Sequence, residues 1–378
     1  MSSRRKKKRY TMPPQSNPNP SLPDDLILSC VARVSRLYYP TLSLVSKSFR
    51  SLIASPELYK TRSLLDRTES CLYVRLKLNP FDENPRWFTL YRKHDRTLTY
   101  NTSNKKKSSV YVLATVPIPH SPLESSSSSL VAVCSNIYNI GGSESPSSSV
   151  SILDCRSNTW REGPSLRVKL MSCAACVLDG KIYVSGSCED DDSTTFQVFD
   201  TNTQTWDLVS IPCSETKHDF HYKIVWFDGK LHMVSNKGVD AYNTKEGRWY
   251  MVEPSREHYK YLYDSYCKIG NVWYSVLKGR FSKFIWYNTE QRVWRELKGM
   301  EGLPKFPFDA CVRLADYGGK MVVLWDMYVL GGKKMIWCAE IALERRGSLE
   351  ICGEVEWFDH ILTVPGRYKF VKVLSATV

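Results

Sequence analysis

The chain has 378 residues, of which 42% are hydrophobic, and this length is enough to bury a sizeable core and to hold more than one domain. Its 52 Lys and Arg residues exceed its 39 Asp and Glu residues, for a net charge of +13, and six of the positive charges stand together in Arg4 to Arg9. The remaining body is only mildly basic, which excludes a surface built to coat nucleic acid, and no apolar run approaches the roughly 20 residues that span a membrane.

Residues 1–20 are basic and then rich in Pro, Asn and Ser, so they cannot bury enough apolar surface to fold and are expected to be disordered. The run Arg4 to Arg9 has two interpretations that stay open, a nuclear import signal and a solvated charged tail. No apolar segment follows it, so no signal peptide is expected, and the chain is predicted to be intracellular, in the nucleus, the cytoplasm or both. The twelve cysteines are then expected to be reduced.

Residues 21–65 are predicted to form a compact module of three short helices. Ser21-Leu22-Pro23-Asp24-Asp25 has the capping residue, the proline and the acids that mark a helix start, and Ser55-Pro56-Glu57 starts a later helix. A module of this size has little core of its own and should pack against another part of the chain. Leu22 and Pro23 lie at its edge, where contact with a partner is expected. Two stripes at helical spacing are expected to face the core: Ile27, Cys30, Val31 and Val34, then Val45, Phe49, Leu52 and Ile53.

One turn recurs four times later in the chain. In each copy an Asp or Asn at a strand end precedes a Trp by six positions, and the Trp residues are 46, 43 and 45 positions apart. The Asp or Asn side chain can accept hydrogen bonds from the turn that it starts, and the Trp supplies an apolar anchor for the next strand. The four pairs are Asp154 and Trp160, Asp200 and Trp206, Asn243 and Trp249, and Asn288 and Trp294.

A four-stranded unit that repeats every 40 to 50 residues or so indicates a blade of a β-propeller. The clearest unit has predicted strands at 172–178, 182–185, 194–200 and 206–209. The fold class is therefore mixed, a small helical module followed by an all-β propeller over residues 66–378. Six blades are favoured, while five or seven remain open, and the six are expected at 71–116, 130–166, 172–211, 221–254, 264–300 and 308–374.

Several motifs resemble a known family. Leu22-Pro23-Asp24-Asp25-Leu26, the stretch from Tyr39 to Arg50, and Ser55-Pro56-Glu57-Leu58-Tyr59 resemble an F-box, and Ile140-Gly141-Gly142 resembles the double glycine of a kelch repeat. Together they are similar to the plant F-box/kelch-repeat proteins. The resemblance implies an F-box at 21–65 that binds the Skp-type adaptor of a cullin RING ubiquitin ligase through Leu22, Pro23 and Leu26. It also implies a kelch-type propeller that holds an unidentified substrate protein, without catalysis and without nucleic acid or membrane as a partner.

Other function classes fit the residues less well. A sialidase-like site would need an arginine cluster, and the arginines here have no recognisable spacing. A copper site of the galactose-oxidase type would need His and Tyr ligands, but His218, His221 and Tyr222 read as a polar loop. The single Cys-x-x-Cys, Cys173 to Cys176, has no second pair at zinc spacing. No catalytic residue, metal or cofactor is therefore expected, although a propeller enzyme, a small-molecule sensor and a kelch scaffold without a ligase stay open.

The substrate is expected on one end of the ring. In an antiparallel blade the first and third connections emerge at one end, and the second connections and the links between blades emerge at the other. The first set is short, as at 179–181 and 201–205, whereas the second set is long and irregular. Long variable loops on a rigid scaffold are the usual place for binding. The residues expected to contact the substrate are Arg167, Arg256, Tyr259 and Arg280.

Overall fold

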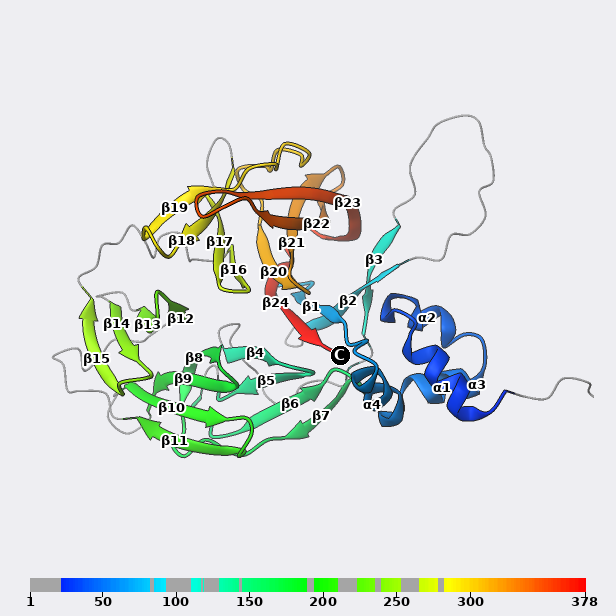
Figure 1. The fold of residues 1–378 in the computed structure, drawn as a ribbon, viewed down its shortest axis with the longest axis horizontal. Helices are drawn as coiled ribbons and strands as arrows, with labels where there is room; N and C mark the ends of the chain where they lie inside the picture. Colours follow the sequence, from blue (N-terminus) through cyan, green and yellow to red (C-terminus); the bar gives the residue numbers. More distant parts are fainter. Residues whose placement is uncertain are drawn as a thin grey trace, which may run out of the picture.

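A computed structural model describes residues 22–81, 85–92, 110–116, 118, 129–142, 145–188, 194–209, 223–234, 239–252, 265–277 and 282–378. The predicted tail 1–20, with Arg4 to Arg9, lies outside these ranges. Short helices come first and strands follow, and Figure 1 shows the helices gathered at one side of a ring of sheets. None of the helices in the described ranges has the length and apolar character needed to cross a bilayer.

The N-terminal module has four α-helices and one 3-10 helix, rather than the three helices predicted. The additional α-helix is α2, and Pro40 lies in its first turn, where a proline is tolerated. Ser46 and Ser55 accept hydrogen bonds from the backbone N–H of Phe49 (3.1 Å) and Leu58 (3.4 Å) and thereby cap the next two helices. The elements are α1 (Asp24–Ala32), η1 (Arg36–Tyr38), α2 (Tyr39–Leu42), α3 (Lys47–Ile53) and α4 (Pro56–Leu64).

The core of this module follows the predicted stripes except at two positions. Val31 is buried, and Phe49 packs against the same cluster. Val45 is predicted to lie in the core, but its side chain is 63% exposed because the helix starts only after the Ser46 cap. Cys30 is exposed as well, so the buried face of α1 is narrower than its apolar pattern suggests.

Six four-stranded antiparallel sheets form the ring, which confirms the propeller and its blade number. In the order below, the first strand of each blade is the innermost and the last is the outermost. Blade 1 contains β24 (Lys369–Thr377), β1 (Ser70–Lys77), β2 (Arg86–Arg92) and β3 (Tyr111–Thr115). Blade 2 contains β4 (Leu130–Val133), β5 (Asn136–Ile140), β6 (Val150–Asp154) and β7 (Thr159–Glu162). Blade 3 contains β8 (Met171–Leu178), β9 (Lys181–Ser187), β10 (Thr194–Asp200) and β11 (Thr205–Val209).

The other three blades keep the same order. Blade 4 contains β12 (Lys223–Phe227), β13 (Lys230–Val234), β14 (Val239–Asn243) and β15 (Arg248–Val252). Blade 5 contains β16 (Tyr266–Ile269), β17 (Val272–Leu277), β18 (Lys283–Asn288) and β19 (Val293–Glu296). Blade 6 contains β20 (Arg313–Tyr317), β21 (Lys320–Val329), β22 (Lys333–Arg345) and β23 (Ile351–Pro365). The hydrophobic clusters join residues of neighbouring sheets, so the core lies between the blades.

The ring closes differently from the prediction. Residues 308–374 are not one blade, because blade 6 ends with β23 and the chain then crosses to blade 1. There β24 pairs with β1 from Ser70 opposite Thr377 to Lys77 opposite Lys369. The physical reason is that residues 70–115 supply only three strands, which leaves the inner edge of β1 without a partner until β24 arrives. In Figure 1, β24 lies beside β1, and it ends near α4.

The recurrent turns have the predicted geometry. The Asp200 side chain accepts hydrogen bonds from the backbone N–H of Asn202 (2.9 Å) and Thr203 (3.3 Å), and Asn288 accepts the equivalent pair at 3.0 Å each. These backbone bonds hold the pKa of the Asp200 carboxyl below its usual value. All four turns place a residue with positive φ four positions after the Asp or Asn. The shared sequence pattern therefore encodes one turn conformation: the positive-φ residues are Asn158, Gln204, Gly247 and Arg292.

The double glycine of blade 2 lets blades 2 and 3 approach each other closely. Gly141 has φ +68, and a Cβ atom there would lie 2.5 Å from the Cys173 sulfur of blade 3. The next residue, Gly142, donates its backbone N–H to the Leu170 carbonyl (3.2 Å) and accepts from the Ser172 N–H (3.2 Å). Only glycine fits so close an approach between the backbones of two blades.

Candidate functional site

The helical module is fixed to blades 1 and 2 by polar contacts from η1. The Arg36 guanidinium donates from Nη2 to the Cys155 carbonyl oxygen (3.2 Å), and the Tyr73 hydroxyl donates to the same oxygen (3.0 Å). At the end of β2, Arg92 Nη1 donates to the Tyr38 hydroxyl (3.1 Å). We call this contact region between the module and the two blades the joint.

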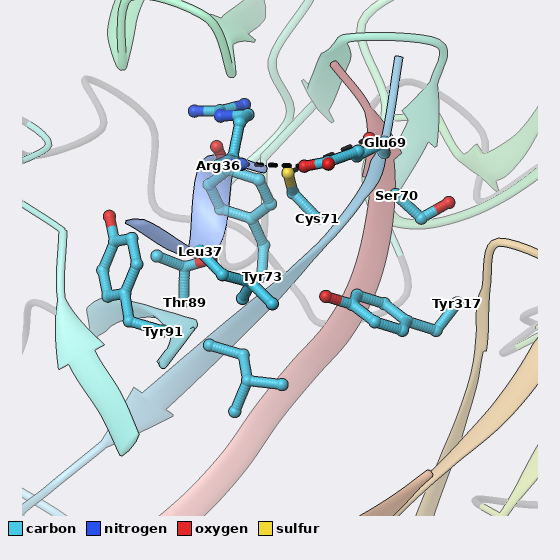
Figure 2. Close-up of a pocket in the computed structure, with 10 residues that line it drawn as sticks. Arg36, Leu37, Glu69, Ser70, Cys71, Tyr73, Thr89, Tyr91 and Tyr317 are labelled. Carbon is cyan, nitrogen blue, oxygen red and sulfur yellow. Dashed lines mark hydrogen bonds between the residues drawn. The ribbon is translucent and has the colours of Figure 1, made fainter. Parts of the chain in front are cut away.

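Glu69, between α4 and β1, lies at the centre of the joint. Its Oε2 accepts from Ser35 Oγ (3.2 Å) and from the backbone N–H of Arg36 (2.8 Å), and it lies 3.3 Å from Arg62 Nη2. Figure 2 shows the Glu69 carboxylate directed at the backbone N–H of Arg36, with the sulfur of Cys71 beside this hydrogen bond. The Glu69 backbone also exchanges two hydrogen bonds with Val378, at 2.9 and 2.8 Å. One residue therefore connects η1, α4 and the end of β24.

Buried side chains of α4 complete the joint. Arg62 is 1% exposed, and its Nη1 donates to the carbonyl oxygens of Ala32 (3.1 Å) and Val34 (2.7 Å). The adjacent Tyr59 packs into an apolar cluster with Tyr73 of blade 1. Burial raises the pKa of both tyrosine hydroxyls, so both remain neutral donors at physiological pH. Sequence reasoning missed Arg62, because a single arginine on a short helix gives no sign that it is buried.

The joint leaves room for little else. The cavity beside η1 in Figure 2 measures about 20 Å³, and Arg36, Cys71, Tyr91 and Tyr317 are among the residues that line it. This volume admits about one water-sized molecule. The joint is therefore a packed structural contact, which sets the position of the helices relative to the ring.

The three residues predicted to bind an adaptor lie at the start of α1, away from the joint. Leu22 is 62% exposed, Leu26 is 52% exposed, and Pro23 caps the helix and accepts the backbone N–H of Leu26 and Ile27 through its carbonyl. Leu44 and Val45, just before α3, are large exposed apolar residues as well. The module thus presents apolar side chains that the described part of the propeller does not cover.

The two ends of the ring differ. We call the end with the second connections and the links between blades the loop face, and the opposite end the turn face. Arg92 ends β2 and Cys155 follows β6, both at the turn face, so the joint lies at that end. The turn face is not limited to tight turns as predicted, because the eighteen residues 93–110 connect β2 to β3 there.

Of the four residues predicted to contact a substrate, the structure describes one. Arg167 lies on the loop face, in the link between blades 2 and 3. Its side chain is exposed and lies 3.6 Å from the Asp207 carboxylate, while its backbone N–H donates to Gln197 Oε1 (2.9 Å). Arg256, Tyr259 and Arg280 fall outside the described residues, so the structure does not bring the four together.

The loop face also has exposed apolar residues that sequence reasoning missed. Leu330, in the turn between β21 and β22, is 100% exposed, and Tyr328 at the end of β21 is exposed too. Phe308, in the link to blade 6, is 81% exposed, and Phe81 of blade 1 is exposed in the connection after β1. The available signal was a leucine directly before Gly331-Gly332, where a turn would normally have a polar residue.

No candidate for metal or thiol chemistry emerges from the described residues. Within them, no three His, Cys, Asp or Glu side chains are arranged to hold a metal ion, and His218, His221 and Tyr222 lie outside the described ranges. Burial raises the pKa of the Cys173 thiol to about 12 and that of Cys176 to about 11. Both thiols of the Cys-x-x-Cys segment are therefore protonated at neutral pH and are poor nucleophiles.

Comparisons with known proteins match both parts of the chain. A family model described as "F-box domain" matches residues 20–61, and one described as "FKB95, Kelch-repeats domain" matches residues 87–362. The F-box/kelch-repeat protein At5g38670 of Arabidopsis thaliana is 62% identical over 369 residues, covering 97% of this chain and 100% of that protein. The putative F-box/kelch-repeat protein At5g38680 of the same plant is 57% identical over 98% of this chain and 99% of its own length.

Proposed function

Since the chain belongs to the F-box/kelch-repeat proteins, we propose that it is the substrate receptor of an SCF-type cullin RING ubiquitin ligase. Its F-box, residues 21–65, binds a Skp-type adaptor, and its propeller, residues 66–378, holds a target protein. The receptor supplies no bond-making residue. It raises the effective concentration of the target near the ubiquitin-loaded enzyme, which is catalysis by proximity.

The observation that supports this proposal most is the exposed apolar edge of a module that is otherwise firmly packed. Leu22, Leu26, Leu44 and Val45 are exposed, whereas Val31, Ala32, Tyr39 and Leu58 of the same module are buried in its core. Contiguous exposed apolar side chains are typical of protein interaction sites. The packed joint also suits a receptor, because a bound target is then held at a defined position relative to the adaptor.

We expect the double variant Leu22→Ala with Pro23→Ala to abolish adaptor binding. Hot-spot residues at the centre of an interface each contribute about 2 kcal/mol or more, so the two truncations together should lower the affinity by about 1,000-fold. Calorimetry with purified adaptor measures the effect. The melting temperature should not change, because Leu22 is exposed and the joint is untouched.

A matched control truncates two exposed apolar residues of the propeller. Leu208→Ala with Leu349→Ala changes two residues that are each 49% exposed, on β11 and beside β23. This control should bind the adaptor as the wild type does. Unchanged adaptor affinity in the Leu22 and Pro23 variant would refute the assignment of the edge.

The target is proposed to bind on the loop face. Exposed Phe308, Tyr328 and Leu330 belong to that end of blade 6, and exposed Arg167 belongs to the link before blade 3. Aromatic and arginine side chains dominate the free energy of many protein interfaces. A stable complex needs roughly 800 Å² from each partner, which several adjacent loops can provide.

Two sets of charge reversals test the face. We expect Arg167→Glu, Arg256→Glu and Arg280→Glu together to release the target while the adaptor stays bound. Lys181→Glu, Lys230→Glu and Lys245→Glu, which alter the turn face, should leave both partners bound. Quantitative mass spectrometry of proteins recovered with each variant from plant cells gives the result. Loss of the target from the turn-face set alone would show that the target binds at the opposite end of the ring.

A further inference from the structure

The innermost strands of all six blades surround a central cavity of about 490 Å³. The lining residues come from β4, β8, β12, β16, β20 and β24. Its volume falls within the range of about 300 to 1,000 Å³ that is usual for small-molecule sites. The proposed ligase function gives this cavity no role, since the adaptor and the target are assigned to other surfaces.

The charged residues that line the central cavity are mostly cations. Alternation along the strands sets this pattern: on β16, Cys267 and Ile269 are buried, while Lys268 between them is only half-buried and belongs to the lining. Among the described lining residues Asp316 has the only carboxylate, and its Oδ1 accepts the backbone N–H of Gly319 (2.8 Å) in the turn after β20. The cations of the lining are Lys223, Lys268, Arg313 and Lys372.

Two of these cations lie against aromatic rings. The Lys223 ammonium is 3.9 Å from the centre of the Tyr266 ring, and the Arg313 guanidinium is 5.9 Å from the centre of the Phe370 ring. Each pair joins neighbouring blades, and Lys223, Tyr266 and Arg313 begin their strands at the loop face. Stacking of this kind fixes the direction of a long side chain without neutralising its charge.

Four cations around one cavity raise the free energy of the folded chain, because they repel one another across walls that screen charge poorly. An anion bound among these four cations would offset this repulsion.

We propose that the central cavity binds a compact small molecule that has at least two phosphate groups. Lysine ammonium groups and an arginine guanidinium are the usual protein partners of phosphate. The cations come from blades 4, 5, 6 and 1, so a ligand with several phosphates would bridge four blades and stabilise the closed ring. The site is distinct from the adaptor edge and from the loops that hold the target.

The test uses the full chain and inorganic tripolyphosphate as the probe. Calorimetry should show saturable binding of one tripolyphosphate per chain, and the melting temperature should rise with probe concentration. Lys268→Met with Lys372→Met removes two cations at nearly constant volume and should weaken binding about 10-fold or more. Without probe, this variant should be as stable as the wild type or more stable, since repulsion is relieved.

The matched control removes two cations from the exterior. Lys47→Met with Lys245→Met has the same change in net charge and should bind tripolyphosphate as the wild type does. Should the Lys268 and Lys372 variant fail to fold, Lys223→Gln with Arg313→Gln tests the same cavity at its loop-face mouth. Non-saturable binding, or an equal loss in the control, would overturn the proposal. Adaptor binding is measured separately, so failure here leaves the ligase assignment untouched.

Discussion

Deletion of residues 369–378 is expected to leave the propeller without a cooperative melting transition. The deletion removes β24, the innermost strand of blade 1, which pairs with β1 along its whole length. It also removes Phe370, Ala376 and Val378, all of which are buried. Blades 6 and 2, which both contact β24, would then face an open seam. Thermal unfolding followed by circular dichroism, with limited proteolysis, measures the effect.

The control for this deletion removes equally many residues from a connection. Shortening the 93–110 segment between β2 and β3 by ten residues leaves both of these strands intact, and changes of this kind in surface connections are tolerated. This variant should melt cooperatively within a few degrees of the wild type. A cooperative transition in the chain that lacks 369–378 would show that the ring does not depend on β24.

We expect Trp206→Ala to lower the free energy of unfolding by about 3 to 5 kcal/mol, as large aromatic truncations in cores do. Trp206 is buried on the outermost strand of blade 3, with its ring centre 4.9 Å from that of Phe199. Its indole N–H donates to the Pro164 carbonyl (2.8 Å), which belongs to the link from blade 2. The substitution therefore removes a packing anchor and a contact between blades. Denaturant titration gives the magnitude.

Trp206→Phe separates the two contributions. It keeps an aromatic ring against Phe199 but loses the indole N–H, so it should cost clearly less than the alanine variant, about 1 to 2 kcal/mol. If Trp206→Ala melts within a degree or two of the wild type, the recurrent Trp is not a blade anchor, and the physical interpretation of the repeat is wrong.

The blades could be predicted from the sequence because each one is specified by local chemistry. Asp200 and Trp206 lie six positions apart, and the groups that form the turn and its apolar anchor all belong to this short segment. The closure of the ring could not be predicted in this way. The strand at 369–377 has the same local pattern as any other strand, and nothing in it indicates that its partner is β1, about 290 residues earlier.

In the helical module, too, some positions could not be predicted from the local sequence pattern. The apolar spacing of Val45 and Phe49 fits one helical face, but the Ser46 cap starts the helix between them and leaves Val45 outside. Arg62 is buried because backbone carbonyls of the preceding segments accept its guanidinium, and these acceptors are about thirty positions away in the sequence. On the loop face, the predicted contacts are three arginines and a tyrosine, whereas Leu330 and Phe81 are the most exposed large apolar residues described there.

The pairing of β24 with β1 has a consequence for biosynthesis. A ribosome that adds about 5 to 20 residues per second needs roughly 15 to 60 s to make the 290 or so residues that separate the two strands. Throughout this time the inner edge of β1 in blade 1 has no partner strand. It can therefore pair with any other extended segment that it meets. Premature stop codons shortly before position 369 should therefore yield products that aggregate or are degraded, although most of the coding sequence would be intact.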